Sequence, residues 1–254
     1  MLEARGLTKY YSAITGVRDV SFTLRPGAVI GLLGPNGSGK STTVGMITGL
    51  LDPSGGSVQL DGQDIREDLV AYKARLGYVP EEAQLYTWMS GAEYLTLCGR
   101  LRVLPTATAA RRIAALLSIF DLQTDRDAPM SAYSKGMRQK ILLSAALLHD
   151  PAIVVLDEPC SGLDVGTTLV VRSLIRRLAD SGHMIVYSSH ELEMVERVCS
   201  EVLILRDGRV AAHASTTALR QQVNASSLED AFRTLVMTAD VDAVAGEILS
   251  AIMH

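Results

Sequence analysis

The chain has 254 residues, of which 48% are hydrophobic and 20% are charged, and its formal net charge is −4. These values are typical of a globular protein whose core is large enough to need no disulfide or metal for stability. Non-specific nucleic-acid binding needs concentrated positive charge, so the absence of a basic block argues against a nucleic-acid partner.

Three cysteines, Cys98, Cys160 and Cys199, are widely spaced and form no C-x-x-C pair. This pattern favours a reduced, cytosolic chain without a thiolate metal site. The first residues lack the apolar segment of a signal peptide. No stretch reaches the ~18 apolar residues that a membrane span requires. We therefore expect any role at a membrane to depend on a partner.

Two or three strands are predicted between Leu2 and Leu24, where apolar and polar residues alternate with the period of a half-buried strand. Tyr11 lies within this segment. Its ring could stack on a nucleotide base, or it could pack in the core as an ordinary strand residue. Spacing alone favours the second interpretation.

A glycine-rich loop follows the next predicted strand, which runs from Ala28 to Leu33. The loop matches the phosphate-binding pattern G-x-x-x-x-G-K-[ST], and its sequence is Gly34-Pro35-Asn36-Gly37-Ser38-Gly39-Lys40-Ser41-Thr42. A helix over 42–49 is predicted to follow. Glycines let backbone N–H groups surround an anion, and a helix N-terminus adds partial positive charge. The motif predicts that Lys40 reaches the β and γ phosphates of a nucleotide and that the Ser41 hydroxyl ligates Mg²⁺.

The middle of the chain changes from strands to helices. A hairpin is predicted at 57–60 with a turn at Asp61-Gly62, and a short strand at 76–79 ends at Pro80, just before Glu81. Between residues 90 and 148 helical periodicity dominates, with helices predicted at 109–120 and 135–148. This region looks like an all-helical insert within an α/β domain.

Strands and helices alternate again in the last third of the chain. Strands are predicted at 152–156 and 184–187, helices at 166–179 and 191–198, and a closing hairpin at 202–212. This alternation predicts a mostly parallel sheet. Weaker helical segments at 217–222, 227–236 and 241–252 form a C-terminal appendage.

Polar side chains follow two of these predicted strands. Ligands of open α/β sheets bind at the carboxyl ends of strands, so Asp157 and Glu158 are expected to lie side by side with the phosphate loop. Asp157 would then hold Mg²⁺ through water, and Glu158 would orient or deprotonate an attacking water. The alternative is a solvated acidic turn. His190 could hydrogen-bond the γ phosphate or be an ordinary surface residue, and spacing does not decide between the two.

Together these motifs resemble the ABC (ATP-binding cassette) ATPases over roughly residues 2–214. Three further motifs carry the resemblance: Tyr133-Ser134-Lys135-Gly136-Met137, Ser161-Gly162-Leu163-Asp164 and Ser189-His190. The sequences of residues 78–82, 133–139 and 228–232 are similar to those of ATPase subunits of ABC-2-type exporters.

The resemblance implies a P-loop NTPase (RecA-like) α/β fold. Its mostly parallel sheet core would carry an antiparallel β part, an inserted all-helical subdomain and a short C-terminal helical appendage. The ATPase domain would span 1–214, with its core at about 1–84 and 149–214 and its helical subdomain at about 85–148. Residues 215–254 would form the extension.

The resemblance also implies a head-to-tail dimer that encloses two ATP molecules. Ser134 and Gly136 would contact the ATP held by the phosphate loop of the partner subunit, and Asp164 would lie at the interface. Tyr11 would stack on adenine, and His190 would sense the γ phosphate. Glu81 stands where the family commonly has glutamine, and it is expected to contact Mg²⁺ through an oxygen.

The expected function is therefore that of an ATP-hydrolysing subunit of a membrane exporter, with ATP and Mg²⁺ as ligands. It would be peripheral to the cytoplasmic face of the cell membrane. Its partners would be a separately encoded transmembrane permease subunit and a second ATPase subunit, identical or different.

Three other functions are possible. An ABC ATPase that acts on DNA or the ribosome is disfavoured by the single cassette, the absence of sustained heptads and the absence of a basic stripe. A P-loop kinase is disfavoured by the motif at 133–137 and by Glu158. A regulatory or assembly ATPase without a transport partner is excluded less well.

Overall fold

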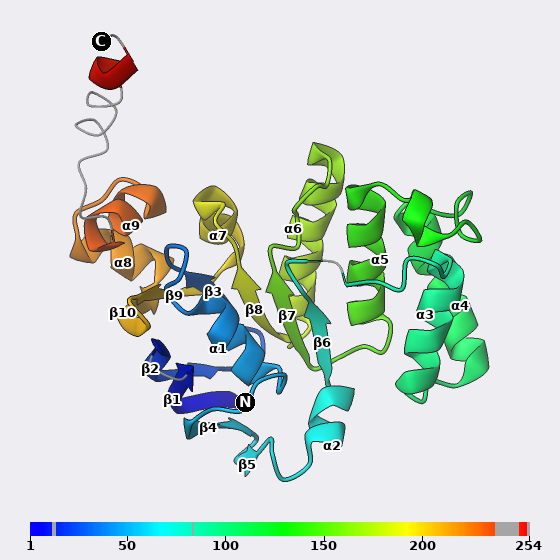
Figure 1. The fold of residues 1–254 in the computed structure, drawn as a ribbon, viewed down its shortest axis with the longest axis horizontal. Coiled ribbons are helices and arrows are strands. Elements are labelled where there is room, and N and C mark those ends of the chain that lie inside the picture. Colours follow the sequence, from blue (N-terminus) through cyan, green and yellow to red (C-terminus); the bar gives the residue numbers. More distant parts are fainter. Residues whose placement is uncertain (12–13, 83, 237–248, 253–254) are drawn as a thin grey trace.

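The computed structural model describes the chain except residues 12–13, 83, 237–248 and 253–254, which are drawn in grey in Figure 1. Within the described residues the strands form two sheets. The larger sheet contains, in spatial order, β10 (Arg209–Ser215), β9 (Glu201–Arg206), β3 (Val29–Leu33), β8 (Met184–Ser188), β7 (Ile153–Asp157) and β6 (Leu76–Val79). The smaller sheet contains β2 (Ile14–Leu24), β1 (Leu2–Tyr11), β4 (Gly55–Leu60) and β5 (Gln63–Asp64).

The larger sheet is parallel except at one edge. Strands β6, β7, β8, β3 and β9 pair in parallel, and β10 pairs antiparallel with β9 through the predicted closing hairpin. Every residue of β3, β7 and β8 is buried, because both faces of the sheet are covered. In β7, for example, Val154 and Leu156 enter one core while Ile153 and Val155 enter the other. The predicted mostly parallel sheet is thus confirmed.

One face of the larger sheet packs against the smaller antiparallel sheet and α1 (Lys40–Ile47). Val44, Met46 and Ile47 of α1 share a core with apolar side chains of both sheets, and Figure 1 shows α1 between β3 and the smaller sheet. The helix α2 (Leu69–Ala74) was not predicted. It has only six residues, too few for a periodic pattern, and it begins where the Asp68 carboxylate accepts a hydrogen bond from Ala71 N.

The other face of the larger sheet is covered by α5 (Lys135–Leu147), α6 (Val165–Asp180) and α7 (Leu192–Val198). Beyond α5 lie α3 (Gly91–Leu101), α4 (Thr106–Ile119) and the 3₁₀ turn η1 (Met130–Ala132), which Figure 1 shows at the side away from the smaller sheet. Helix α3 starts at a capping box between Ser90 and Glu93. Helices α3, α4 and α5 all fall within 85–148, the interval predicted as the helical subdomain.

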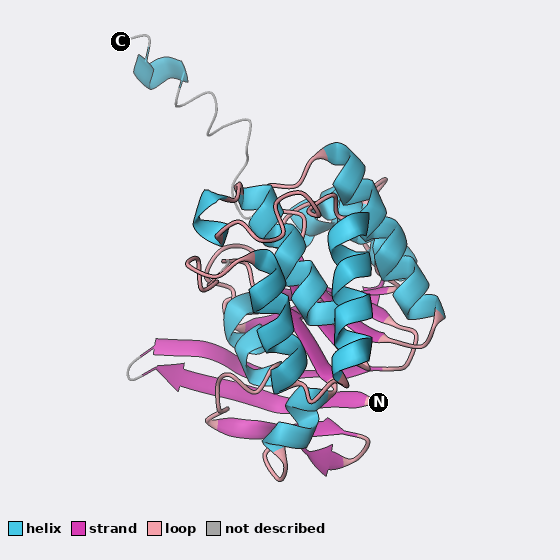
Figure 2. Ribbon diagram, turned by 90° about the vertical axis from the view of Figure 1, so that its right-hand side faces the viewer, coloured by secondary structure: helices cyan, strands magenta, loops and turns pink. Residues whose placement is uncertain are grey.

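The helices α8 (Thr216–Gln222) and α9 (Leu228–Val236) confirm two of the three predicted C-terminal segments. The third, at 241–252, lies largely outside the described residues. Figure 2 shows most of the helices on one side of the smaller sheet. Among the helices that the structure describes, none is long and apolar enough to cross a membrane.

Candidate functional site

The phosphate loop joins β3 to α1, and two of its glycines are needed for its shape. Gly39 has a φ of 101°, and a Cβ atom there would lie 2.3 Å from Val17 Cγ1. Gly34 has a φ of 151°, and a Cβ atom there would lie 2.4 Å from Ser38 Oγ. A side chain at either position would both strain the backbone and collide with a neighbour. The helix begins at Lys40, two residues earlier than predicted, so Lys40 lies in its first turn.

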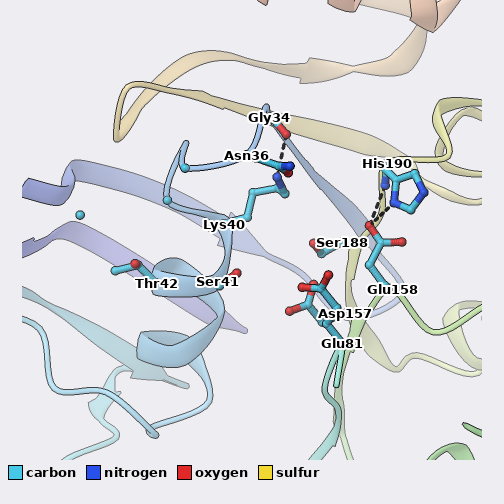
Figure 3. A pocket seen from close by; sticks show the side chains of 13 residues that line it. Gly34, Asn36, Lys40, Ser41, Thr42, Glu81, Asp157, Glu158, Ser188 and His190 are labelled. Carbon is cyan, nitrogen blue, oxygen red and sulfur yellow. Dashed lines mark hydrogen bonds and ion pairs between the residues drawn. The ribbon is translucent and has the colours of Figure 1, made fainter. Parts of the chain in front are cut away.

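A cavity of about 870 Å³ opens beside this loop. Its lining comes from the loop, from β2 and from the carboxyl ends of three strands of the larger sheet, and consists of Gly16, Gly34, Asn36, Gly37, Gly39, Lys40, Ser41, Thr42, Glu81, Asp157, Glu158, Ser188 and His190. Figure 3 shows the phosphate loop on one side of the cavity and the carboxylates on the other. Most of the predicted phosphate, metal and water-activating residues therefore line a single cavity. Pro35 and Ser38 of the predicted loop do not line it.

Lys40 turns back onto its own loop. Its Nζ donates hydrogen bonds to Gly34 O at 2.7 Å and Pro35 O at 3.1 Å. Burial lowers the pKa of Lys40, and the nearby Glu158, Asp157 and Glu81 carboxylates oppose that shift. A phosphate oxygen would form a stronger, charge-assisted bond with this ammonium group than the neutral carbonyls do. The lysine is thus placed to exchange its partners for an anion.

The strands that carry the two halves of the site are not neighbours. The phosphate loop and Asp157-Glu158 are predicted to lie side by side, but β8 lies between β3 and β7. Ser188, the last residue of β8, fills this position and lines the cavity. Its hydroxyl is buried and makes no hydrogen bond of normal geometry among the described residues, but it lies close enough to the Asp157 carboxylate to lower the pKa of that group. Sequence reasoning missed Ser188 because nothing in the sequence fixed the strand order.

Asp157 ends β7 at the base of the cavity, and its side chain lies beside Glu81, which follows β6 (Figure 3). Burial raises the pKa of Asp157 and the Glu81 and Glu158 carboxylates add to this effect, whereas the Ser188 hydroxyl and Lys40 oppose it. A bound divalent cation would relieve this repulsion. Hydroxyl and carboxylate oxygens are the donors that Mg²⁺ accepts, and it commonly keeps waters and phosphate oxygens as further ligands. The oxygen donors of Ser41, Asp157 and Glu81 fit that chemistry. Among the residues that the structure describes, this site included, no group of three or more His, Cys, Asp or Glu side chains could hold a metal by itself.

Glu158 adopts an unusual backbone conformation, with a φ of 47°. Its side chain is held by three contacts: Oε1 accepts from His190 N at 2.8 Å and lies 2.8 Å from His190 Nδ1, and Oε2 accepts from Ser189 Oγ at 3.1 Å. The Glu158 side chain is 13% exposed, whereas that of His190 is 80% exposed. These residues hold the carboxylate facing the cavity. His190 lines the same cavity as the phosphate loop, and its contact with Glu158 is not predicted by the sequence.

Tyr11 lies outside the cavity lining but next to it. Its hydroxyl is 3.4 Å from Thr42 Oγ1, and its ring packs so closely on Gly16 that a Cβ atom there would lie 2.7 Å from a ring carbon. Tyr11 is 45% exposed, so the interpretation of a buried core residue is wrong, and Lys9 Nζ lies over its ring at 5.8 Å from the ring centre. Gly16 was missed, although a glycine inside a strand marks a close approach of this kind.

Ser134 and Gly136 lie away from this cavity, at the start of α5. Ser134 is the exposed N-cap, and its Oγ accepts from Met137 N at 3.2 Å. The backbone N–H groups of a helix N-terminus favour an anion. Asp164 similarly caps α6 by accepting a hydrogen bond from Thr167 N. Within the described residues, Ser134 does not line the cavity that contains the phosphate loop of its own subunit.

Comparison with known proteins agrees with this geometry. The family model for ABC transporters matches residues 17–161. The chain is 35% identical to the ABC-type transporter ATP-binding protein EcsA of Bacillus subtilis (strain 168), over 92% of this chain and 96% of that protein. It is 32% identical to the linearmycin resistance ATP-binding protein LnrL of the same organism, over 90% and 73%. A solved ATP-binding subunit of an ABC transporter superposes with a TM-score of 0.88 at 32% identity, over 92% of this chain and 99% of that one. The chain therefore belongs to the family of ABC transporter ATP-binding subunits, which bind and hydrolyse ATP.

Proposed function

We propose that this subunit hydrolyses Mg²⁺-bound ATP to drive a membrane exporter from the cytoplasmic face. The observation that carries the proposal is the meeting of Lys40, Asp157 and Glu158 in one cavity at the end of the parallel sheet. The similarity to LnrL, whose name refers to resistance, supports export of a compound as the work that hydrolysis performs.

The charged side chains of the cavity and Ser41 have roles in this proposal. Lys40 and the loop N–H groups bind the phosphates, and Ser41, Asp157 and Glu81 hold Mg²⁺, directly or through water. When bound, Mg²⁺ neutralises charge on the phosphate oxygens. Glu158 orients the attacking water and accepts its proton, because its carboxylate is fixed by hydrogen bonds while its oxygens still face the cavity.

The site is completed by a second ATPase subunit. Ser134 and Gly136 lie outside the cavity of their own chain, at an exposed helix N-terminus that suits a γ phosphate. In a two-fold dimer the same pair of surfaces meets twice, so each ATP would touch the phosphate loop of one subunit and α5 of the other. His190 would contact the γ phosphate from the side of the phosphate loop, and Tyr11 would stack on adenine.

A mixing experiment tests the shared site. We expect Lys40→Ala to lose tight ATP binding and Ser134→Arg to block the α5 N-terminus, so each variant alone is inactive. In an equal mixture about half of the dimers contain one of each, and each such dimer has one intact site of two, so about a quarter of wild-type turnover should return. A mixture as inactive as its components would contradict the shared site.

A second experiment tests the membrane partner. The subunit is purified by affinity from detergent-solubilised membranes of its own host, and a polytopic membrane protein is expected in stoichiometric amount. ATP-dependent efflux of a compound would then be measured in vesicles reconstituted with the subunit and this membrane protein. Recovery of the subunit without any integral membrane protein would instead favour a regulatory or assembly ATPase.

A further inference from the structure

The loop that follows Glu158, residues 159–162, is fastened to the first turns of α5 by two side chains. The Gln139 side-chain amide donates to Pro159 O at 3.0 Å, and Lys135 Nζ donates to Ser161 Oγ at 2.7 Å. Backbone contact is close as well, since a Cβ atom on Gly136 would lie 2.6 Å from the carbonyl oxygen of this loop at Gly162. Two elements far apart in sequence are thereby joined directly beside the carboxylate of the site.

Gln139 is unusual among the residues that α5 buries. It is 2% exposed, and its neighbours on the buried face of the helix are largely apolar (Ile141, Leu142, Leu143 and Ala146). A buried amide is costly unless it is hydrogen-bonded, and the Pro159 carbonyl is the partner that the structure gives it. The Gln139 side chain therefore stabilises the loop rather than the packing of the helix.

The backbone at Glu158 needs such support. With a φ of 47° the residue occupies the left-handed region, which persists only when its surroundings hold it in place. Glu158 N donates to Ser188 O at 2.9 Å, and Glu158 O accepts from Ser161 N at 3.1 Å. Between these two hydrogen bonds, the Gln139 amide holds the carbonyl of Pro159. The strained turn is thus held from β8 on one side and from α5 on the other.

We propose that Gln139 is a positioning residue for Glu158, with the Lys135–Ser161 hydrogen bond as a second tie. This inference rests on the proposed function. Since the same helix begins at Ser134 and Gly136, nucleotide that reaches α5 from the partner subunit acts through Gln139 on the Glu158 of the other ATP site. The two sites of a dimer are thereby connected through one helix and one loop.

Replacing Gln139 with methionine tests the proposal, because methionine keeps the length of the side chain but has no donor. We expect kcat for ATP hydrolysis by the full-length chain to fall about tenfold, with the KM for ATP within about twofold of wild type. The matched control is Ser144→Ala, which removes another buried hydrogen bond of α5, from Ser144 Oγ to Lys140 O at 2.8 Å. Equal effects of the two variants on kcat would overturn the proposal.

A double-mutant cycle separates positioning from general damage to the fold. In the Glu158→Gln background, Gln139→Met should leave the residual rate unchanged, because there is no longer a base to position. A further tenfold loss in that background would overturn the inference. If Gln139→Met does not fold, Ser161→Ala takes its place, because it removes the Lys135–Ser161 hydrogen bond. Its kcat is expected to fall about threefold at unchanged KM. An unchanged kcat would refute a positioning role for this hydrogen bond.

The outcomes also separate this inference from the proposed function. If Glu158→Gln turns over ATP like wild type, the role of Glu158 fails and the inference fails with it. If Glu158→Gln is impaired while Gln139→Met is not, the proposed function stands and the positioning role of Gln139 is refuted.

Discussion

Replacing Glu158 with glutamine is expected to stop hydrolysis while leaving nucleotide binding intact. The glutamine amide oxygen can still accept from His190 N, and its NH₂ group can donate to Ser189 Oγ, so two of the three contacts that fix the side chain have replacements. What is lost is the ability to accept a proton. General-base catalysis contributes at least about 10²-fold, which corresponds to about 2.7 kcal/mol, so kcat should fall by that factor or more.

The affinity for ATP should stay the same or increase, although kcat falls. Three carboxylates, Glu81, Asp157 and Glu158, line the same cavity as the phosphate loop. Removing one negative charge lowers the repulsion that the phosphates of ATP meet, so the Kd for ATP should be equal to or below that of wild type. The assay pairs steady-state phosphate release with titration of a fluorescent ATP analogue.

The control for this variant is Glu82→Gln, which removes an exposed carboxylate next to Glu81 that does not line the cavity. It should leave kcat unchanged. Turnover of Glu158→Gln within about threefold of wild type would refute the reasoning, because general-base catalysis is worth far more than that. Unchanged melting temperatures of both variants would show that differences in rate come from the site.

Three further predictions concern binding, stability and pH. Tyr11→Ala should weaken ATP binding about tenfold through lost base stacking while Tyr11→Phe keeps it, and fluorescence titration giving equal affinities for both variants would exclude stacking. Tyr72→Phe should lower the free energy of unfolding by about 1–2 kcal/mol, since the Tyr72 hydroxyl donates to the buried Ile47 O, and urea unfolding that matches wild type would contradict this. Burial lowers the pKa of His149 from 6.5 to about 4, so between these values the unfolded chain binds a proton that the folded chain does not, and stability falls as the pH falls. The variant His149→Gln keeps a donor for Leu76 O, which accepts a hydrogen bond from His149 Nε2, but it has no imidazole to protonate. It should therefore lose less stability between pH 7 and pH 5 than wild type does. Equal losses of stability in urea titrations would refute this.

The sequence was informative wherever local chemistry determines structure. The phosphate loop, the apolar strand before it and the acidic pair at the end of β7 were predicted because each combines a short pattern with a physical requirement: glycine at positive φ, full burial, or a ligand at a strand end. The helix α5 was predicted to within one residue for the same reason, as its apolar periodicity is long and its N-cap is Ser134. Helix α2 was missed because six residues give no period.

Features set by tertiary arrangement could not be predicted from single-residue patterns. The position of β8 between β3 and β7 follows from the order of strands in the sheet, and this order placed Ser188 in the cavity. The contact of Gly16 with Tyr11 and the positive φ of Glu158 depend on neighbours that are distant in the sequence. Alternation of strands and helices predicts a parallel sheet but not the order of its strands.

The C-terminal helices have a consequence for the choice of a minimal fragment. The Glu196 carboxylate of α7 pairs with Arg220 at 2.8 Å and accepts from Leu228 N at 3.3 Å, and Leu219, Leu228 and Ala231 are fully buried in the same core as the helices over the sheet. A chain cut after residue 215 would uncover that apolar surface and leave Glu196 unpaired. Since α7 begins two residues after His190, the damage would reach the nucleotide site, and a shortened cassette would be a poor stand-in for the whole subunit.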